Sequence, residues 1–536
     1  MQRISSILIA MAGIVFGGVA KEVIVVNNTG DSGRATLRQA IWDANAGLGS
    51  RIEIHAQGII TLLSPLPVLE GDIHLIGPGA NRLVVDANFL PKVFRIAQAS
   101  SSHIEGLTVS NALEIVPVFE SGGGGSAIDN EGRLILEDCV FTDCVVGSMQ
   151  GGSGGGIRNW REMTIKRCRV VNCGTFGDSL FYDVAGGGIA NYGTMVMENS
   201  EVRNCQGYYG GGILNTGKMT LIRCGVLGCY SGPQADGGGI FNQGDLRLDT
   251  CVISGNSGFW AGGVASYRRG FLAGEASTLV CTDSIISGNS GSSEGGGLVL
   301  LGDSEFLGCT ISSNRSDLGG GLLNSGRARF VNCTFSGNSS FAAGSAVQFT
   351  DFGLPNELEF DHCTIVSNRS EFLPQGAGIG SDPGLAVRAG NCIITHNDGV
   401  GSNGNLYSLG YNVFGDTNGI VTAPNTRNDL VGVDPRLGPL QDNGGFTPTH
   451  ALLEDSPAID AGIANGLKQD QRGYPRKRNI PRVDNGGDGS DIGAYEYQGT
   501  PRGSGGHGNG HGNENGHGNG NGHGNGNGNR GVQGRR

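Results

Sequence analysis

The residues Gly210-Gly211-Gly212-Ile213-Leu214-Asn215 recur along the chain with small changes. Related turns of three glycines and an aliphatic residue lie at 154–157, 186–189, 210–213, 237–240, 295–298 and 319–322, with weaker copies at 262–264 and 376–379. Five turns place asparagine two residues after the aliphatic residue, at Asn159, Asn191, Asn215, Asn242 and Asn324. An internal repeat of this kind predicts a solenoid in which each unit packs only against its neighbours.

A second pattern lies between the turns, where apolar residues alternate and a segment such as Cys309-Thr310-Ile311-Ser312-Ser313-Asn314 follows. Alignment of these segments gives two columns. The first holds Cys139, Cys168, Ser200, Cys224, Cys251, Ser284, Cys309, Cys333, Cys363 and Cys392. The second, five residues later, holds Cys144, Cys173, Cys205, Cys229, Asn256, Asn289, Asn314, Asn338, Asn368 and Asn397. Ten coils are therefore predicted, about 28 residues apart.

Alternating apolar residues indicate strands. Stacked coils about 4.8 Å apart would place each column residue above its counterpart, so asparagine side chains can form hydrogen-bonded ladders in the interior. Short strands are also expected before the first cysteine, from Ile73 to Val109. The predicted fold is all-β, a right-handed parallel β-helix. A short helix from Thr36 to Ala46, with Leu37 and Ile41 on its apolar face, is expected to cap the first coil.

The thirteen cysteines bear on both compartment and packing. Exported proteins usually use cysteine in disulfides. Twelve of the cysteines fall in the two columns, where neighbouring sulfur atoms would lie slightly beyond disulfide range, and Cys281 stands apart. The columns therefore favour buried free thiols. Zinc binding is disfavoured, because no Cys-x-x-Cys pair occurs.

Residues 1–20 have the features of an export signal: Arg3, an apolar run from Ile7 to Val19, and small residues at 18–20. The run is shorter than a membrane span requires, so cleavage is expected and no transmembrane segment should remain. The formal net charge of −12 disfavours nucleic acid as a partner. A secreted or cell-surface location is expected, and the oligomeric state is left open.

Three segments resemble known bacterial surface proteins. Residues Val25 to Ala46 resemble the CSLREA module, with its signature at Ala35-Thr36-Leu37-Arg38-Gln39-Ala40. The Gly-rich rhythm is similar to the repeats of polymorphic outer-membrane proteins. Residues 443–496 resemble the choice-of-anchor Q domain, through Ser456-Pro457-Ala458-Ile459-Asp460-Ala461-Gly462 and Asp491-Ile492-Gly493-Ala494-Tyr495-Glu496. The resemblance implies a secreted or surface β-helix protein and carries no agreed activity.

These observations divide the chain into five parts. They are an export signal at 1–20, a CSLREA-like cap at 21–58, coils at 59–400, last coils with the choice-of-anchor Q-like region at 401–498, and a Gly/Asn/His-rich tail at 499–536. The tail cannot bury enough apolar surface to fold, so disorder is expected there. It has no hydrophobic or sortase-like anchor, so free secretion and peripheral attachment both stay open.

The function favoured by the sequence is a binding or adhesion scaffold for a polysaccharide or cell-surface glycan. The position three residues after the aliphatic residue of each turn should point to solvent. It holds Trp160 and Tyr192 in adjacent coils, so their rings should lie on neighbouring rungs. Nearby loops add Tyr208, Tyr209 and Trp260. Exposed aromatic rings suit sugar faces, although the same rings could simply cover the coil corner.

The alternative function is a polysaccharide lyase or glycoside hydrolase, which needs matched carboxylates or a basic residue on adjacent coils. No such cluster is evident in the sequence. Asp361-His362 falls in a turn column that other coils fill with unrelated polar residues, so an exposed turn is expected there. The run 484–491 is interpreted as a polar turn rather than a Ca²⁺ loop. The tail histidines His507, His511, His517 and His523 could bind a transition metal weakly; otherwise no cofactor, metal or catalytic residue is assigned.

Overall fold

The computed structural model describes residues 23–117, 123–148, 152–177, 184–268, 275–371, 378–397, 405–415, 428–481 and 483–499. The chain divides into two units, Met1–Tyr497 and Gln498–Arg536. The first unit holds nearly all of the described residues. The expected export signal and the tail from residue 500 onward lie outside the described residues.

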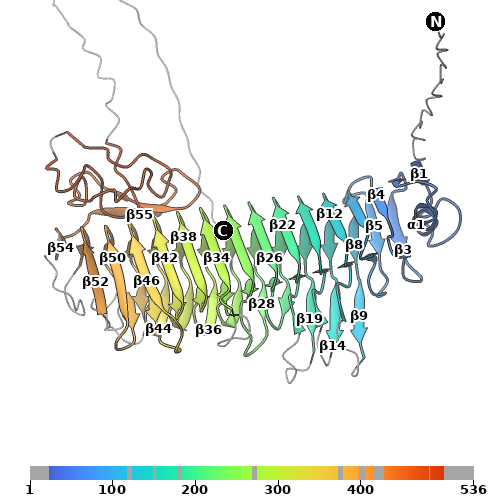
Figure 1. The fold of residues 1–536 in the computed structure, drawn as a ribbon, viewed down its shortest axis with the longest axis horizontal. Helices are drawn as coiled ribbons and strands as arrows, with labels where there is room; N and C mark the ends of the chain where they lie inside the picture. The colour runs from blue at the N-terminus through green and yellow to red at the C-terminus, as the bar shows by residue number, and fades with distance from the viewer. Residues whose placement is uncertain are drawn as a thin grey trace, which may run out of the picture. The chain divides into compact units, whose positions relative to one another are not determined.

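The central coils of the first unit pass through the same four sheets in the same order, and strands of successive coils pair in parallel (Figure 1). Sheet A has fifteen described strands. They are β1 (Val23–Val26), β2 (Arg51–Ile54), β4 (Asp72–Ile76), β7 (Ser101–Glu105), β12 (Arg133–Glu137), β17 (Glu162–Lys166), β22 (Thr194–Glu198), β26 (Lys218–Ile222), β30 (Asp245–Asp249), β34 (Thr278–Thr282), β38 (Asp303–Leu307), β42 (Arg327–Val331), β46 (Glu357–Asp361), β50 (Ala386–Gly390) and β52 (Asn405–Gly410).

Sheet B follows sheet A after a two-residue corner and also has fifteen described strands. They are β3 (Gly58–Thr61), β5 (Leu83–Asp86), β8 (Thr108–Ser110), β13 (Val140–Thr142), β18 (Arg169–Val171), β23 (Glu201–Arg203), β27 (Gly225–Leu227), β31 (Val252–Ser254), β35 (Ile285–Ser287), β39 (Thr310–Ser312), β43 (Thr334–Ser336), β47 (Thr364–Val366), β51 (Ile393–Thr395), β53 (Val413–Phe414) and β54 (Leu430–Val431).

Sheet D comes next in each coil and is followed by the glycine turn. Its strands are β9 (Leu113–Val116), β14 (Val145–Ser148), β19 (Gly174–Phe176), β24 (Gln206–Gly207), β28 (Tyr230–Ser231), β32 (Ser257–Trp260), β36 (Ser290–Glu294), β40 (Arg315–Leu318), β44 (Ser339–Ala343) and β48 (Arg369–Ser370). A small sheet of β10 (Gly123–Gly124), β15 (Gly152–Ser153) and β20 (Val184–Ala185) precedes three of the turns.

Sheet C completes the coil with the three residues that start at the aliphatic residue of each turn. Its strands are β6 (Phe94–Ile96), β11 (Ile128–Asn130), β16 (Ile157–Asn159), β21 (Ile189–Asn191), β25 (Ile213–Asn215), β29 (Ile240–Asn242), β33 (Val264–Ser266), β37 (Leu298–Leu300), β41 (Leu322–Asn324), β45 (Val347–Phe349) and β49 (Ile379–Ser381). The predicted stacked parallel coils are therefore confirmed.

The glycine turns are fixed by conformation and by space. Gly154 has φ of 70°, in the left-handed region that favours glycine. A Cβ on Gly155 would lie 2.2 Å from the Gly174 carbonyl oxygen and 2.3 Å from that of Gly187, so the stacked backbones leave no room for a side chain. The turn therefore needs glycine for two separate reasons, and this need produces the repeat in the sequence.

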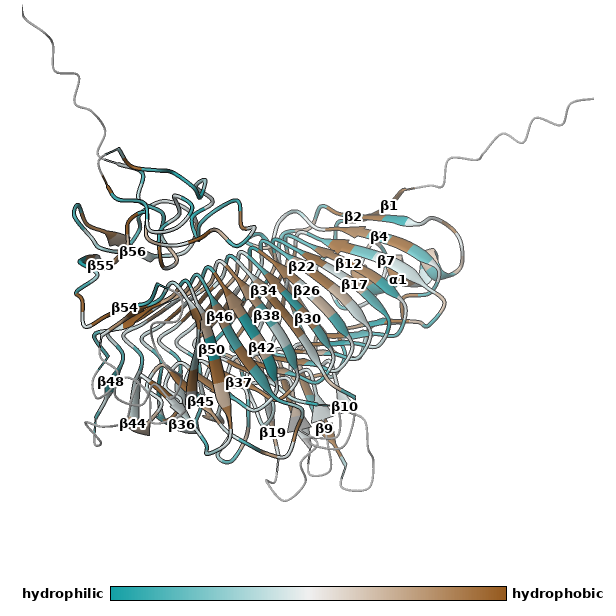
Figure 2. Ribbon diagram, turned by 60° about the vertical axis from the view of Figure 1, so that its left-hand side comes forward, coloured by the Kyte–Doolittle hydropathy of each residue, from teal (hydrophilic) through white to brown (hydrophobic). Residues whose placement is uncertain are grey.

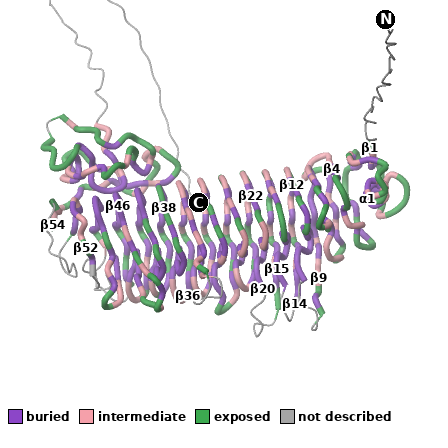
Figure 3. The backbone as a smooth tube through the Cα atoms, in the orientation of Figure 1, coloured by how far each residue is buried: buried purple, intermediate pink, exposed green. Residues whose placement is uncertain are grey.

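Apolar side chains and two asparagine ladders fill the interior, which stays buried from coil to coil (Figure 3). In the first ladder, each side-chain amide from Asn130 to Asn215 donates to the next asparagine in the stack at 2.7–2.8 Å. The second ladder runs from Asn256 to Asn397, with amide-to-oxygen distances of 2.9–3.0 Å. These bonds satisfy buried amides in an otherwise apolar core, as predicted.

All thirteen cysteines are buried, and none forms a disulfide. The Sγ atoms of Cys281 and Cys309 approach to 3.7 Å, which is a contact between thiols and not a bond. Burial raises the pKa of Cys224 to about 12. Twelve cysteines therefore act as small apolar residues at the corners of the coils, as predicted, while Cys281 lies within strand β34 of sheet A.

Helix α1 (Leu37–Asn45) covers the first coil, and Thr36 caps its N-terminus by accepting a hydrogen bond from the Gln39 amide. Leu37, Ala40, Ile41 and Ala44 are buried, as the apolar face predicts. Arg38 is buried as well, because its guanidinium donates to Asp31 and to the carbonyl oxygens of residues 64 and 65. The predicted capping helix is confirmed.

Residues 428–497 pack on the outer face of sheet B in its second half (Figure 1). This region contains the antiparallel pair β55 (Leu437–Gln441) and β56 (Thr449–Leu452). Thr310 Oγ1 donates to the Pro448 oxygen at 2.7 Å, and Thr334 Oγ1 donates to Gln471 Oε1 at 2.6 Å. Strands β39, β43 and β47 are consequently buried on both faces.

The prediction that Asp361 and His362 form an exposed turn is wrong, because the C-terminal region covers them. Both residues are buried, and His362 is 0% exposed. His362 Nδ1 lies 2.6 Å from Asp361 Oδ1, and His362 Nε2 lies 2.8 Å from the Ile463 oxygen. Burial lowers the pKa of His362, which favours the neutral ring. The pair therefore fastens the C-terminal region to the coils and does not face a substrate.

Candidate functional site

The middle residue of a sheet C strand lies outside the main core, and its character changes along the stack. Figure 2 shows the hydropathy of the strands along the coils. Near the N-terminus, these positions hold Asp129 and Arg158, which form a buried ion pair at 2.9 Å. Further along, they are apolar and form a second hydrophobic cluster outside the core, which we call the outer cluster. Its buried members are Ala185, Ala190, Leu214, Phe241, Ala261, Ala265, Tyr267, Val299, Leu301, Leu323 and Leu354.

The structure brings Trp160 and Tyr192 together, as the sequence predicts. Their rings stack with centroids 4.4 Å apart and planes inclined by 18°. Trp160 is 44% exposed, and the Arg158 guanidinium lies 5.3 Å from the centre of its ring. Tyr192 is partly buried against the outer cluster. The pair therefore presents an aromatic face beside a charged group held in place by Asp129.

The other three predicted residues also lie at the outer cluster, either in contact with it or one residue removed. Tyr209 and Trp260 pack against the cluster, and Tyr208 meets Tyr209 edge to face with centroids 5.0 Å apart. Tyr209 in turn lies 5.0 Å from Phe241. The expectation that the whole ring-bearing column points to solvent is wrong at Tyr267, which is 0% exposed beneath Phe241 and Trp260.

Sequence reasoning missed a column at the residue that directly precedes the glycine turn. Backbone pairing places Asp236 beside Trp260, Trp260 beside Glu294, and Glu294 beside Leu318. Tyr209 precedes Asp236 in this column, because the Gly210 amide donates to the Asp236 oxygen. Two carboxylates and two aromatic rings thus alternate on four successive coils.

Burial changes the acidity of both carboxylates. It raises the pKa of Asp236 to about 7, while a hydrogen bond with Tyr267 opposes the rise and the nearby Glu294 adds to it. Burial also raises the pKa of Glu294 and of the Tyr267 hydroxyl. Asp236 is only 7% exposed, and its neighbours include Trp260, its backbone partner in the next coil, and Tyr267, with which it forms a hydrogen bond. A carboxyl group that keeps its proton near neutral pH can act as a general acid.

A sequence signal for this column exists. The residue before each turn is Ser153, Ala185, Tyr209, Asp236, Trp260, Glu294 or Leu318. Only two of these are acidic, and aligning the turns places them two coils apart, with a tryptophan between them. The perturbed acidity has no such signal, since it depends on rings that lie far away in the sequence.

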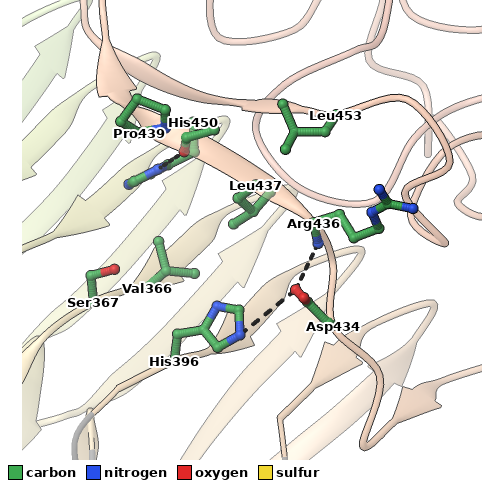
Figure 4. Close-up of a pocket in the computed structure, with 10 residues that line it drawn as sticks. Val366, Ser367, His396, Asp434, Arg436, Leu437, Pro439, His450 and Leu453 are labelled. Carbon is green, nitrogen blue, oxygen red and sulfur yellow. Dashed lines mark hydrogen bonds and ion pairs between the residues drawn. The ribbon is translucent and has the colours of Figure 1, made fainter.

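A separate pocket of about 440 Å³ lies between sheet B and the β55–β56 pair (Figure 4). His396 and Asp434 face each other in it at 3.7 Å, and both side chains are more than half exposed. His450 is fixed there by the Gly438 oxygen and by Ser336. Exposed pairs of this kind contribute little binding energy, so this pocket is a weaker candidate than the sheet C surface.

Comparison with known proteins agrees with the geometry of the coils. The model of the right-handed beta helix region matches residues 174–316 and 265–414. The protein is a right-handed parallel β-helix. A search of curated proteins found no match to this β-helix. Within the described residues, no helix has the length and apolar character needed to cross a membrane.

Solved structures with a similar chain path include three β-helix neighbours. The A-module of the Azotobacter vinelandii mannuronan C-5 epimerase AlgE4 is 13% identical, with a TM-score of 0.35 over 72% of this chain and 96% of the module. The catalytic domain of a GH87 alpha-1,3-glucanase is 13% identical, with a TM-score of 0.39 over 72% of this chain and 69% of that one. Tailspike protein 3 of bacteriophage CBA120 is 12% identical, with a TM-score of 0.36 over 75% and 59%.

Proposed function

We propose that this β-helix binds a polysaccharide or a cell-surface glycan along the outer side of sheet C. The observation that carries the proposal is the stacked pair of Trp160 and Tyr192 on adjacent coils, with Trp160 44% exposed. Flat aromatic rings offer a large apolar face at low entropy cost, which suits the faces of sugar rings. Beneath the ring, the buried ion pair of Arg158 with Asp129 places the guanidinium 5.3 Å from the Trp160 centroid and so supports the position of the ring.

The spacing of the aromatic residues supports a chain ligand rather than a single sugar. Trp160, Tyr192, Tyr209 and Trp260 belong to four different coils, and the last three pack against the outer cluster. Stacked coils rise by about 4.8 Å, so the rings follow the stack over a length that an oligosaccharide can span. In this proposal the protein is exported through residues 1–20 and acts outside the cell or on its surface as a binding scaffold.

Replacing both Trp160 and Tyr192 by Ala is expected to weaken glycan binding at least tenfold, a loss of about 1.4 kcal/mol. The melting temperature should change little, because Trp160 is 44% exposed. A glycan array followed by affinity measurements on the bound glycans checks this. Trp42→Ala is the matched control, because Trp42 is a similarly exposed tryptophan (53%) that belongs to helix α1 and not to a coil that carries the proposed surface.

Equal binding by the double variant would refute the proposed surface. A large fall in its melting temperature would instead assign the rings to packing of the coil corner.

Hydrolysis of the bound glycan is a second candidate function, favoured by the Asp236–Glu294 pair. The two residues lie two coils apart, so their backbones are separated by about 9.6 Å. Inverting glycosidases hold their two carboxyl groups about 6.5–9.5 Å apart to leave room for a water molecule, so the Asp236 and Glu294 side chains must reach that spacing past Trp260, which lies between them in the column. In this function Asp236 protonates the leaving oxygen, and Glu294 takes a proton from the attacking water.

Asp236→Asn and Glu294→Gln are each expected to lower hydrolysis of a bound glycan at least about a hundredfold, because each removes a proton-transfer group. The wild-type rate should fall as the pH rises through about 7, where Asp236 loses its proton. Release of reducing ends checks both expectations. Asp317→Asn, an exposed carboxylate on β40, is the control. Glycan binding without release of reducing ends at any pH would leave the β-helix as a scaffold only.

A further inference from the structure

Two histidines and a glutamate meet on the outer face of sheet A, at the opposite end of the chain from the C-terminal region. His74 on β4 and His103 on β7 are paired in register, and their rings stack with centroids 4.3 Å apart and planes inclined by 5°. Glu105 stands two residues after His103, so it points to the same side of the sheet. Its carboxylate oxygens lie 3.6 Å from His74 Nε2 and 3.7 Å from His103 Nε2.

A second carboxylate completes the group. Glu137 on β12 is in register with Glu105, and its carboxylate lies 3.3 Å from His103 Nε2. Arg167 pairs with Glu137 and also with Asp138, and the Arg167 contact lowers the pKa of Glu137. On the other side, Arg51 is engaged by Glu53 at 2.8 Å. The neighbouring arginines are therefore paired with other carboxylates. The two imidazole rings and the Glu105 carboxylate form the centre of the group.

The Nε2 atoms of His74 and His103 lack the hydrogen bonds that buried nitrogen atoms normally form. Both are shielded from solvent, and neither has a hydrogen-bond partner in the described structure. Buried polar atoms normally find a partner, because leaving one unsatisfied is costly. Here both atoms face the Glu105 carboxylate at distances too long for hydrogen bonds. The contact of His103 Nε2 with Glu137 at 3.3 Å is an ion pair only when the ring is protonated. A cation between them would satisfy all three groups.

The donor set matches a divalent transition metal. The ligand atoms of His74, His103 and Glu105 all lie within 4.8 Å of one another. A tetrahedral Zn²⁺ site with bonds of about 2.0–2.1 Å needs ligand atoms about 3.3 Å apart. The two parallel rings must therefore turn out of their stack before both nitrogens can bind one ion.

We propose that His74, His103 and Glu105 form a binding site for a divalent transition metal, with Zn²⁺ as its model ion. Glu137 is the nearest additional carboxylate, and a water molecule can fill an open fourth position. Two imidazoles and one carboxylate also suit Fe²⁺, and the test below distinguishes among metals. The site lies on early coils of sheet A, so it is separate from the glycan surface proposed on sheet C.

No motif in the sequence predicts this site, since His74 and His103 are 29 residues apart and follow no metal-binding spacing. They become neighbours only through the coil register. The four tail histidines are a competing source of metal binding, so the test must separate the two. We therefore choose a full-length background in which His507, His511, His517 and His523 are replaced by Asn.

In this background, calorimetric titration of the metal-free protein with ZnCl₂ at pH 7.5 is expected to show one site per chain. Ni²⁺, Co²⁺ and Fe²⁺ titrations rank the metals, and the visible spectrum of bound Co²⁺ reports a tetrahedral site. His103→Asn and His74→Asn should each weaken Zn²⁺ binding at least tenfold. His55→Asn is the matched control, because His55 is 59% exposed and lies 3.4 Å from a single carboxylate, Glu53.

Melting curves without metal show whether each variant is folded, and the rise in melting temperature on adding Zn²⁺ gives a second measure of binding. Loss of this rise in the His74 and His103 variants, with its retention in the His55 variant, supports the site. Unchanged Zn²⁺ affinity in both of the first two variants would overturn it, as would the absence of any binding in the parent background. Neither result bears on glycan binding, so the two proposals fail separately.

Discussion

Replacing Ile41 by Asp is expected to destabilise the first coils by about 4 kcal/mol or more, since it places a carboxylate in an apolar contact without a partner. Ile41 is 0% exposed on α1, and this helix packs against strands β1 and β2. Thermal unfolding and limited proteolysis measure the effect. We expect a lower melting temperature and early cleavage within residues 23–117.

The adjacent Trp42 provides the control. Trp42→Asp introduces the same group one residue away, at a side chain that is 53% exposed. It should leave both the melting curve and the cleavage pattern close to those of the parent protein. If the two substitutions behave alike, the helix does not protect the end of the solenoid.

The physical reason for this large effect is the open end of the stack. The first strands of sheets A and B have a neighbour on one side only. An uncovered strand edge exposes backbone groups that pair readily with another chain. Helix α1 covers this end with Leu37, Ala40, Ile41 and Ala44. A charge on this face is thus expected to promote aggregation as well as unfolding.

The coil interior could be predicted from the sequence because its constraints are local and repeated. The glycine turn needs a left-handed residue and space for stacked backbones, and most copies meet both needs with glycine, although Ala261 takes the left-handed position in one copy. The inward asparagine must sit above another hydrogen-bonding residue, so it recurs in every coil of a ladder. The same residue types are therefore required at the same positions of successive coils, and aligning the turns makes these positions visible in the sequence.

The outer faces could not be predicted in the same way, because their environment is set by residues distant in sequence. His362 occupies a turn position that is polar in other coils, yet residues 428–497 bury it. Tyr267 belongs to the same column as the exposed Trp160, yet Phe241 and Trp260 cover it. The repeat predicts where a side chain points, but not what lies above it.

The candidate site falls between these cases. The column rule places Trp160 and Tyr192 on adjacent rungs and so predicts that they meet, and their rings do stack. The Asp236–Trp260–Glu294 column obeys the same rule, but its members are 24 and 34 residues apart because the coils between them differ in length. The high pKa of Asp236 arises from burial among residues of several coils, and no spacing in the sequence encodes it.

Asn314 belongs to the second asparagine ladder, and Asn314→Asp is expected to lower the free energy of unfolding by about 4 kcal/mol or more at pH 8. The substitution keeps the shape of the side chain and changes only its hydrogen-bonding groups. Asn314 Nδ2 donates to the Ile286 oxygen at 2.9 Å and to Asn338 Oδ1 at 3.0 Å. In the variant, a carboxylate oxygen faces these two acceptors inside a core where Asn314 is 0% exposed.

The pH dependence of this loss separates the ladder from a packing effect. The carboxylate that Asn314→Asp introduces has no cation beside it in the ladder, so burial raises its pKa above that of the unfolded chain. Stability is then greatest at low pH, where both states hold the proton, and it declines as the pH rises through the two pKa values. The deficit relative to the parent protein should therefore be larger at pH 8 than at pH 5.

Urea unfolding at both pH values measures this deficit. Asn204→Asp is the control, because Asn204 is an exposed residue at a coil corner. An Asn314→Asp variant with the parent's unfolding midpoint at pH 8 would show that the stacked amides contribute little to holding the coils together.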